Sequence, residues 1–533
     1  MIVRITDLKL PLGSPTHYLG DEVARRLNLT ADDFGPIRIR RRALDARRAS
    51  YLQYVYTVEV DTPLTERAIA SIAGVEPVRA DSVAPVVPGS HEMRGQPVIV
   101  GAGPAGLFAA WRLSEYGYQP ILLERGKPVE DRRYDTAAFW KNGTLDPDSN
   151  VLFGEGGAGA FSDGKLTSRI KDARREEVLG ILAMCGAPEN IVYDARPHVG
   201  TNRLPYILRE LRTRLLAQGT EIRFGTRMTD LGDTNGMRYV DTNHYRIDSG
   251  VVVLAIGHSA RDTYAMLAKR NIALEPKPFA MGIRVQHSQE LIDRAQYGRA
   301  AGTQGLEAGE YVLTCARTNV GRAVYSFCMC PGGTVIPCAS EPGTLCCNGM
   351  SGEHRSGPYA NGAIVAEVST RDFADDTPLG GIELQRVWER KAFEATGGTY
   401  ALPVMALDDF VRGEFRKRSR DELALRRFPR AEFVDLHQLL PETTTAAIRQ
   451  ASKQFNRQIR GWIGSGGVAF GIETRTSAPV RILRNETGES ISTPGLFPAG
   501  EGAGYAGGII SAAVDGLRAA EAVIKKYARS HAS

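Results

Sequence analysis

The sequence of 533 residues lacks any apolar run long enough to cross a membrane. Stretches such as 97–100 and 250–256 are far shorter than the ~20 residues that a spanning helix needs. Residues 1–10 carry charges and no apolar core, so an export signal is not expected. Seven cysteines are too few for a disulfide scaffold and fit a reducing compartment. We therefore expect a cytoplasmic protein that does not bind membranes, with two or three domains for its length.

The sequence also lacks a large excess of charge of either sign, because 66 Lys and Arg residues against 61 Asp and Glu residues give a formal net charge of only +5. The exception is PIRIRRRALDARR, residues 36–48, with six arginines and one aspartate. This strip could bind nucleic acid or another partner through Arg40, Arg41 and Arg42. It could also be an edge strand whose charges stay in solvent and prevent aggregation. Because no aromatic residues lie between the arginines, we favour the edge strand.

Residues 1–90 have the pattern of a small α+β domain. Residues 1–12 and 51–62 predict strands, and residues 20–29 are amphipathic as a helix is. Residues 65–74 predict a second helix that ends at a glycine. Residues 79–96 are polar and contain prolines, so they predict a linker.

The strongest motif follows this linker, in PVIVGAGPAGLFAAWRLSEYGYQPILLERG. A short buried strand leads into Gly101, Gly103 and Gly106, which complete a G-x-G-x-x-G turn into an apolar helix, and a second strand ends at Glu124. The glycines permit a tight turn and close approach of a diphosphate, and the start of the helix supplies free N–H groups. The carboxylate can accept hydrogen bonds from a ribose. The segment therefore predicts a dinucleotide site.

Three further residues of this segment, Pro104, Ala105 and Arg125, resemble the form of the fingerprint that binds FAD. A later stretch, YRIDSGVVVLAIGHSARD at residues 245–262, predicts a strand followed by Ala-Ile-Gly, which ends at Gly257. It resembles the strand that crosses back under the FAD domain in flavoproteins with two dinucleotide domains. At this point the dinucleotide can be FAD or NAD, and the rest of the chain decides between them.

Near the C-terminus, FPAGEGAGYAGGIISAAVDGLRAA predicts a strand, an acid and a helix. Its resemblance to glutathione-reductase-like flavoproteins implies that Gly500 and Glu501 lie at the ribityl or diphosphate part of FAD. The helix that begins at Gly508 and Ile509 would point its N–H groups at the flavin. No further strand with a terminal acid follows, so we expect this segment to be the far wall of the site begun at Gly101.

A third glycine-rich loop, FGEGGAGAFSDGKLTSR, spans residues 153–169. Glycines such as Gly156 and Gly157 suit a backbone that packs flat against a planar ring. The phenylalanines that flank them are unusual for an exposed loop, so we expect a cofactor contact that includes Ser162. Lys165 would lie near the flavin N5 atom or a substrate anion.

Together with the fingerprint, the motifs GEGGAGAFSDGKL, AIGHSARDT, FAMGIRVQH, CPGGTV, NGMSGEHR and AGEGAGYAGGI resemble the uncharacterised FAD-dependent dehydrogenase family, which is related to the aminoacetone-oxidase-like bacterial flavoproteins. The resemblance covers the whole chain and implies an α/β fold with FAD as cofactor. A Rossmann-type FAD-binding domain, residues 94–275 and 491–533, would be interrupted by a mixed α+β substrate domain with a β-rich part, residues 276–490. The α+β domain of residues 1–90 precedes both.

Two expected motifs are missing. No second G-x-G-x-x-G with a downstream acid occurs, so a separate NAD(P)H domain is not evident. The C-x4-C pair of disulfide reductases is also absent. The flavin would therefore be reduced by the substrate, or by NAD(P)H that binds transiently over the ring.

Catalytic candidates are few. Cys328, Cys330, Cys338, Cys346 and Cys347 match neither zinc nor Fe–S spacing, so we expect no metal and mostly structural thiols. Cys330 is the exception, because the family resemblance includes its CPGG turn. His354 and Arg355 could bind a carboxylate or act as acid and base, together with Lys165. His258 and His287 are weaker candidates.

The leading functional hypothesis is an FAD-dependent oxidoreductase that moves hydride between flavin N5 and a C–N or C–C bond of a small molecule. One alternative is a flavin-dependent monooxygenase or nucleic-acid-modifying enzyme that uses the arginine-rich strip. The other is a flavin-binding redox sensor without catalysis. The sequence leaves the substrate, the electron acceptor and the oligomeric state open.

Overall fold

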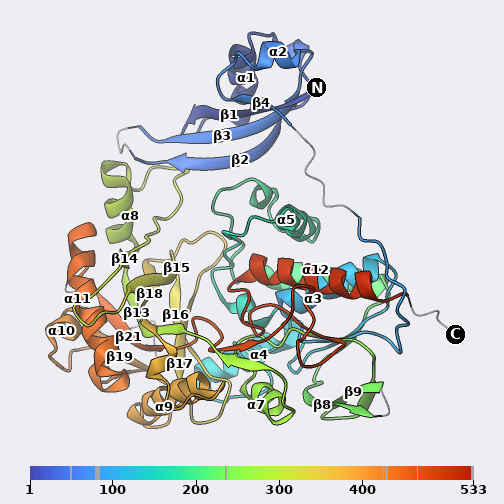
Figure 1. Cartoon of the computed structure of the whole chain (residues 1–533). Coiled ribbons are helices and arrows are strands. Elements are labelled where there is room, and N and C mark those ends of the chain that lie inside the picture. The colour runs from blue at the N-terminus through green and yellow to red at the C-terminus, as the bar shows by residue number, and fades with distance from the viewer. Residues whose placement is uncertain are drawn as a thin grey trace.

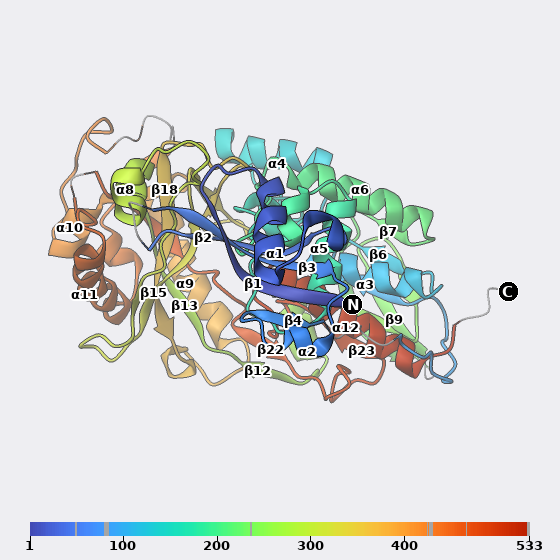
Figure 2. The same cartoon turned by 90° about the horizontal axis from the view of Figure 1, so that it is seen from above.

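A computed structural model describes residues 1–47, 51–78, 85–234, 237–423, 425, 430–464 and 466–529. Residue 48 of the arginine-rich strip and residues 79–84 of the expected linker lie outside this range. Figure 1 shows a small N-terminal head above a larger body. Seen from above, the head covers the middle of the body (Figure 2).

The head is a four-stranded antiparallel sheet in the order β2-β3-β1-β4. Its strands are β1 (Ile2–Pro11), β2 (Arg38–Asp45), β3 (Gln53–Asp61) and β4 (Val75–Pro77), and its helices are α1 (Leu19–Leu27) and α2 (Glu66–Ile69). Alternate residues of β1 and β3 pack with α1 in one apolar cluster. The arginine-rich strip forms β2 at an edge of the sheet, as expected. The helix expected over 65–74 is limited to α2.

The body contains a five-stranded parallel sheet in the order β23-β11-β5-β6-β7. These strands are β5 (Val98–Val100), β6 (Ile121–Leu123), β7 (Glu221–Arg223), β11 (Val252–Leu254) and β23 (Leu496–Pro498). Because all five are parallel, the loops that follow them meet at one edge of the sheet. The stretch 245–262, in which one strand is expected, contains two, since a bend at Gly250 separates β10 (Arg246–Asp248) from β11.

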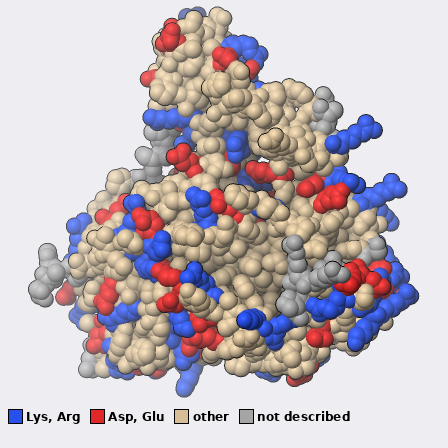
Figure 3. Space-filling view, turned by 180° about the vertical axis from the view of Figure 1, so that it is seen from behind, with Lys and Arg blue, Asp and Glu red and all other residues tan. Residues whose placement is uncertain are grey.

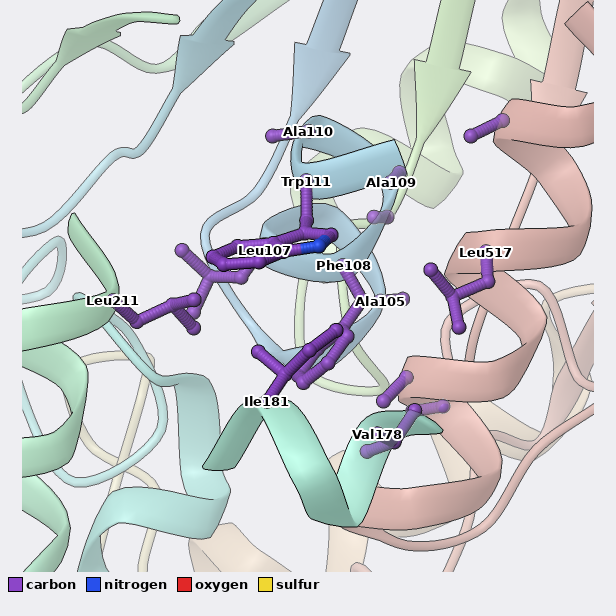
Figure 4. Packing of buried hydrophobic residues seen from close by; sticks show 14 of the residues in the cluster. Ala105, Leu107, Phe108, Ala109, Ala110, Trp111, Val178, Ile181, Leu211 and Leu517 are labelled. Atoms are coloured by element: carbon purple, nitrogen blue, oxygen red, sulfur yellow. The ribbon is translucent and has the colours of Figure 1, made fainter. Parts of the chain in front are cut away.

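Both faces of this sheet are covered. On one face, Ile99, Leu122 and Val253 pack with helices α3, α5, α6 and α12. Figure 4 shows α3 between α12, which carries Leu517, and the residues Val178, Ile181 and Leu211. The alternate strand residues pack on the other face with α7 and β8. The helices are α3 (Pro104–Glu115), α4 (Val129–Asn142), α5 (Arg174–Met184), α6 (Leu204–Ala217), α7 (Arg261–Lys269) and α12 (Ile509–Lys526).

A second sheet is inserted in the sequence between β11 and β23. It has seven strands in the order β14-β15-β18-β13-β21-β19-β20, antiparallel except for the pair β19 and β20. Its strands are β13 (Phe279–Ser288), β14 (Thr314–Cys315), β15 (Val324–Cys330), β18 (Tyr359–Val368), β19 (Leu402–Ala406), β20 (Ala431–Phe433) and β21 (Val468–Glu473). The apolar face of α11 packs on β13 and β18.

The remaining elements connect these layers. The other helices are α8 (Gln289–Tyr297), α9 (Gly380–Ala395), α10 (Leu407–Arg412) and α11 (Glu442–Gln458). The small sheets are formed by β8 (Met228–Thr234), β9 (Met237–Thr242) and β10, by β12 (Leu274–Pro276) and β22 (Val480–Ile482), and by β16 (Thr334–Cys338) and β17 (Cys346–Met350). The predicted fold class is confirmed: a Rossmann-type α/β part is interrupted by a mixed, β-rich part behind an α+β head. The division at 90, 275 and 490 stays our proposal.

Candidate functional site

An extended cavity lies at the edge where the loops after β5, β6, β11 and β23 meet. Residues of β15 and β21 from the second sheet, and of β17 from the small β16-β17 sheet, also line it. The predicted cofactor residues that line the cavity are Gly101, Gly103, Pro104, Ala105, Glu124, Arg125, Gly157, Ser162, Lys165, Gly257, Glu501, Gly508 and Ile509. Segments more than 400 residues apart in the sequence therefore share one site.

The glycines of the first turn have different surroundings. A Cβ atom on Gly106 would lie 1.8 Å from the carbonyl oxygen of Gly101, so this position is closed by packing. Gly106 is not among the cavity-lining residues. A Cβ atom on Gly103 would meet nothing closer than 3.9 Å, at Gly157. Protein packing therefore requires glycine at position 106. At position 103 protein packing leaves room for a Cβ atom, so only a bound ligand would require glycine there.

Glu124 has a role that the sequence did not predict. Its carboxylate accepts hydrogen bonds from the backbone N–H groups of Ala102 (2.8 Å), Gly126 (2.9 Å) and Gly154 (3.0 Å). The side chain is buried, yet it still lines the cavity. It ties the third glycine loop to the first, and the expected ribose contact stays a prediction.

The third glycine loop is held by Arg132 from α4. This guanidinium is fully buried and donates to five carbonyl oxygens, those of Asn150, Val151, Gly154, Glu155 and Gly157. Burial lowers the pKa of Arg132 to about 10. Gly156 packs behind the cavity and donates its N–H to the carbonyl of Ala102. The sequence did not predict this role of Arg132, because the segment around it contains several charged residues and is typical of an exposed helix.

The C-terminal glycine segment, like the first glycine turn, has some residues that pack against protein and others that line the cavity. Gly500 does not line the cavity, since its N–H donates to Asp515 (2.7 Å) and its Cα faces Ala105. Glu501 lines the cavity, and burial raises its pKa to about 7, against the influence of nearby Lys277. Gly508 precedes α12, whose first residue also lines the cavity, so a helix N-terminus opens there as expected.

The predicted catalytic residues do not form one group. Lys165 lines the cavity, contacts Asp163 (3.0 Å) and Glu310 (3.7 Å), and donates to the carbonyl of Met329. Arg355 is buried and binds the same two carboxylates from behind. His354 is exposed and does not line the cavity. Lys165 and Arg355 are thus linked through Asp163 and Glu310, whereas His354 lies apart.

The cysteine expected at the site, Cys330, is fully buried and does not line the cavity. Cys328 lines it instead. The reason is a bulge in β15: Phe327 pairs with Ala363 and Cys330 with Asn361, so the strand carries one extra residue. Strand alternation could not reveal which of the two thiols faces the cavity.

Other side chains of this wall were missed as well. Asn348, Glu473 and Arg475 line the cavity. Glu473 binds the fully buried Arg284 of β13 (2.9 and 3.1 Å). Arg475 binds Glu389 of α9 (2.8 and 3.0 Å). The one sign of a buried ion pair in the sequence is that Arg284 lies within the otherwise apolar strand FAMGIRVQH.

The two histidines differ in position. His258 lines the cavity and shares a hydrogen bond with Ser259 (2.6 Å). Burial and the charges of Arg475 and Arg261 lower its pKa to about 4. His287 is buried away from the cavity, and its Nε2 lies 2.8 Å from the carbonyl oxygen of Trp462. Burial lowers the pKa of His287 to about 4, so both imidazoles are neutral at pH 7.

The arginine-rich strip faces the body of the molecule. Arg42 forms a bidentate contact with Asp194 (2.6 and 2.8 Å) and lies over the rings of Tyr54 and Tyr193. Arg40 contacts Glu176 of α5. On the face seen in Figure 3, acidic and basic residues are interspersed rather than gathered in a basic strip. These contacts favour docking of the head over nucleic-acid binding.

Within the described part of the chain, no cluster of three or more His, Cys, Asp or Glu side chains could hold a metal ion. Among the same residues, no helix has the length and apolar character to span a bilayer.

Three sequence families match the chain. Residues 278–476 match the FAD-dependent protein, C-terminal domain-like family, residues 99–129 the NAD(P)-binding Rossmann-like domain, and residues 1–61 a domain of unknown function. An uncharacterised protein of Clostridium beijerinckii is 41% identical over 532 residues, which cover 99% of each chain.

Likenesses to solved structures are weaker. A geranylgeranyl bacteriochlorophyll reductase-like protein of Thermoplasma acidophilum is 12% identical with a TM-score of 0.33, over 81% of this chain and 78% of that chain. CtdE in complex with FAD is 12% identical with a TM-score of 0.31, over 80% of this chain and 82% of that chain.

Proposed function

The chain belongs to the family of its clostridial relative and carries the C-terminal domain of FAD-dependent proteins, and from this premise we propose that it is an oxidoreductase that transfers hydride between a small molecule and FAD. The bond oxidised or reduced would be C–N or C–C. The observation that carries the proposal is the single cavity that joins the fingerprint edge of the parallel sheet to polar side chains of the second sheet.

The residues present suit FAD. No side chain caps the start of α3 or of α12, and the first residues of both helices line the cavity. A diphosphate would be held by the N–H groups of the first helix turn, next to Gly103. The second helix start would favour negative charge at the other end of the cofactor. When bound, FAD supplies a ring that accepts or donates two electrons and a proton.

The chain's own groups can manage protons around such a reaction. Glu501 has a pKa of about 7, so at neutral pH it can either give or take a proton in the cavity. His258 is neutral at the same pH and can take part in hydrogen bonds, because burial and nearby arginines lower its pKa to about 4. Lys165, which is held by Asp163 and Glu310, places a cation on the same wall.

Two observations weigh on the alternatives. The arginines that a nucleic-acid-modifying enzyme would use are partly engaged with Asp194 and Glu176. A redox sensor would need no group in the cavity that exchanges a proton near neutral pH, yet Glu501 lies there. NAD(P)H stays a candidate transient reductant, and the cytoplasm the expected location.

The test is anaerobic bleaching of the purified yellow protein. NADH, NADPH and a panel of primary and secondary amines are mixed separately with the protein, and flavin absorbance is followed. Rapid bleaching by an amine, with hydrogen peroxide after air is admitted, indicates an oxidase. Rapid bleaching by NAD(P)H indicates a reductase or monooxygenase. If the protein binds FAD but nothing reduces it at a useful rate, the sensor is correct and the oxidoreductase proposal fails.

A further inference from the structure

Cys328 has an unusual backbone. It lies in the bulge of β15 and has a φ of 44°, a value that residues other than glycine rarely adopt within a strand. Such a conformation is unfavourable and persists where surrounding contacts enforce it. The result is that Cys328 lines the cavity, although the strand around it is otherwise packed in a sheet.

Two cations hold this bulge. Arg284 donates from Nη1 to the carbonyl oxygen of Cys328 (3.1 Å), and Lys165 donates to the carbonyl oxygen of Met329. Arg284 is itself fixed by Glu473 and is fully buried. The bulge is therefore part of a buried ion-pair network rather than a loose irregularity.

A second thiol lies behind the first. The Sγ atom of Cys330 is 3.4 Å from the carbonyl oxygen of Cys328 and 4.0 Å from Nη1 of Arg284. A hydrogen bond from Cys330, together with Arg284 and Lys165, lowers the pKa of the Cys328 thiol to about 6 against the effect of burial. The same hydrogen bond and burial raise the pKa of Cys330. These opposite shifts favour ionisation of Cys328, which faces the cavity, before that of Cys330 behind it.

We propose that Cys328 and Cys330 form a redox-active Cys-x-Cys pair that exchanges two electrons with the bound flavin. The flavin part of this inference rests on the proposed function. A thiolate that is open to the cavity and a protected partner thiol are what reversible disulfide chemistry requires.

The step balances without another reactant. The Cys328 thiolate and the Cys330 thiol form an Sγ–Sγ bond, and Cys330 loses its proton. Two electrons and that one proton convert oxidised FAD to its anionic reduced form. The reverse step returns the electrons and the proton and opens the disulfide. This pair differs from the C-x4-C pair of disulfide reductases, which the sequence lacks.

The chain contains a matched control pair. Cys338 and Cys346 lie opposite each other in the ladder of β16 and β17, and Sγ of Cys346 is 3.5 Å from the carbonyl oxygen of Cys338. Both are buried and neither lines the cavity. A disulfide there would also remove two of the seven thiols, so the test must tell the two pairs apart.

Met329 makes this distinction possible, because cyanogen bromide cleaves between Cys328 and Cys330. Air-oxidised holoprotein is alkylated in denaturant, cleaved, and analysed by mass spectrometry with and without reductant. We expect fragments 282–329 and 330–350 to stay joined until they are reduced. Cys330→Ala should separate them, whereas Cys338→Ala should not. Separate fragments in the wild type without reductant would overturn the proposal, and this readout needs no variant to fold.

A reductive titration with dithionite tests the electron count. Oxidised wild-type holoprotein should take up four electrons per flavin, Cys328→Ala and Cys330→Ala two, and Cys338→Ala four. Uptake of two electrons by the wild type would also overturn the proposal. If the protein binds no FAD, oxidation by diamide followed by the same cleavage still tests the pair, so failure of the proposed function is distinguishable from failure of this inference.

Discussion

The two walls of the cavity are built in different ways. The wall from the parallel sheet presents mainly backbone, namely glycines and the starts of α3 and α12. One of its carboxylates, Glu124, accepts hydrogen bonds from three backbone N–H groups. The wall from the second sheet presents side chains such as Cys328 and Glu473, and Arg475 just after β21. Those side chains are held by buried ion pairs.

This difference separates binding from chemistry. A backbone wall can hold a cofactor that many proteins share, because N–H groups and helix starts recognise phosphate without particular side chains. A side-chain wall can be changed residue by residue to suit a substrate. We therefore expect changes to the first wall to affect FAD content, and changes to the second wall to affect stability and reactivity.

The largest effect is expected for Arg284→Met in the second wall. The change leaves Glu473 buried without its partner, so the free energy of unfolding should fall by about 3–5 kcal/mol. Urea unfolding measures this. Arg246→Met, which removes the exposed pair with Asp241, is the control and should cost less than about 1 kcal/mol. Similar losses in both variants would mean that the second wall does not depend on its buried pair.

Gly106→Ala should have the next largest effect, on the first wall. Its Cβ atom would lie 1.8 Å from the Gly101 carbonyl oxygen, so the backbone must shift at a cost of about 1–3 kcal/mol. Gly180→Ala in α5 is the matched control, because its Cβ meets nothing within 4 Å. That variant should be as stable as the wild type or more so. Thermal unfolding compares them, and an unchanged Gly106→Ala protein would contradict the packing described here.

The parts of the two walls that the sequence predicted are those encoded by residues close together in the chain. The turn through Gly101 and Gly106 and the helix after Gly508 were predictable, because each is encoded within a few neighbouring residues. The pair of Arg284 and Glu473 joins residues 189 positions apart, and no local pattern names the partner. The bulge at Cys328 depends on the pairing of β15 with β18, so alternation could not show that Cys328, rather than Cys330, lines the cavity.

Glu501→Gln should change how stability depends on pH. Burial raises the folded pKa of Glu501 from 4.5 to about 7, so its contribution to stability is fully present below pH 4.5 and is lost as the pH rises through 7. The variant should resemble the wild type at pH 4 and be more stable by up to about 3 kcal/mol at pH 8. Urea unfolding at the two pH values is the measurement. The exposed Glu290→Gln is the control, and a difference that does not vary with pH would refute the assignment.

The smallest effect is expected at His287, outside both walls. Its folded pKa of about 4 lies below the ordinary 6.5, so its contribution is present above pH 6.5 and is lost as the pH falls through 4. As the pH falls from 6.5 to 4, the free energy of unfolding of His287→Gln should therefore decrease less steeply than that of the wild type. The difference in the pH slope corresponds to up to about one bound proton. The exposed His17→Gln should keep the wild-type slope, and equal slopes in all three proteins would count against a buried neutral imidazole.

The central claim is that the backbone wall binds FAD, and Gly103→Ala tests it most directly. The added Cβ atom meets no protein atom closer than 3.9 Å, so the flavin-free variant should unfold at the same urea concentration as flavin-free wild type. A cofactor diphosphate held against the turn would meet that atom. We predict one FAD per wild-type chain after purification and a loss of FAD affinity of tenfold or more in the variant. Unchanged FAD content and affinity in a normally folded variant would contradict the account.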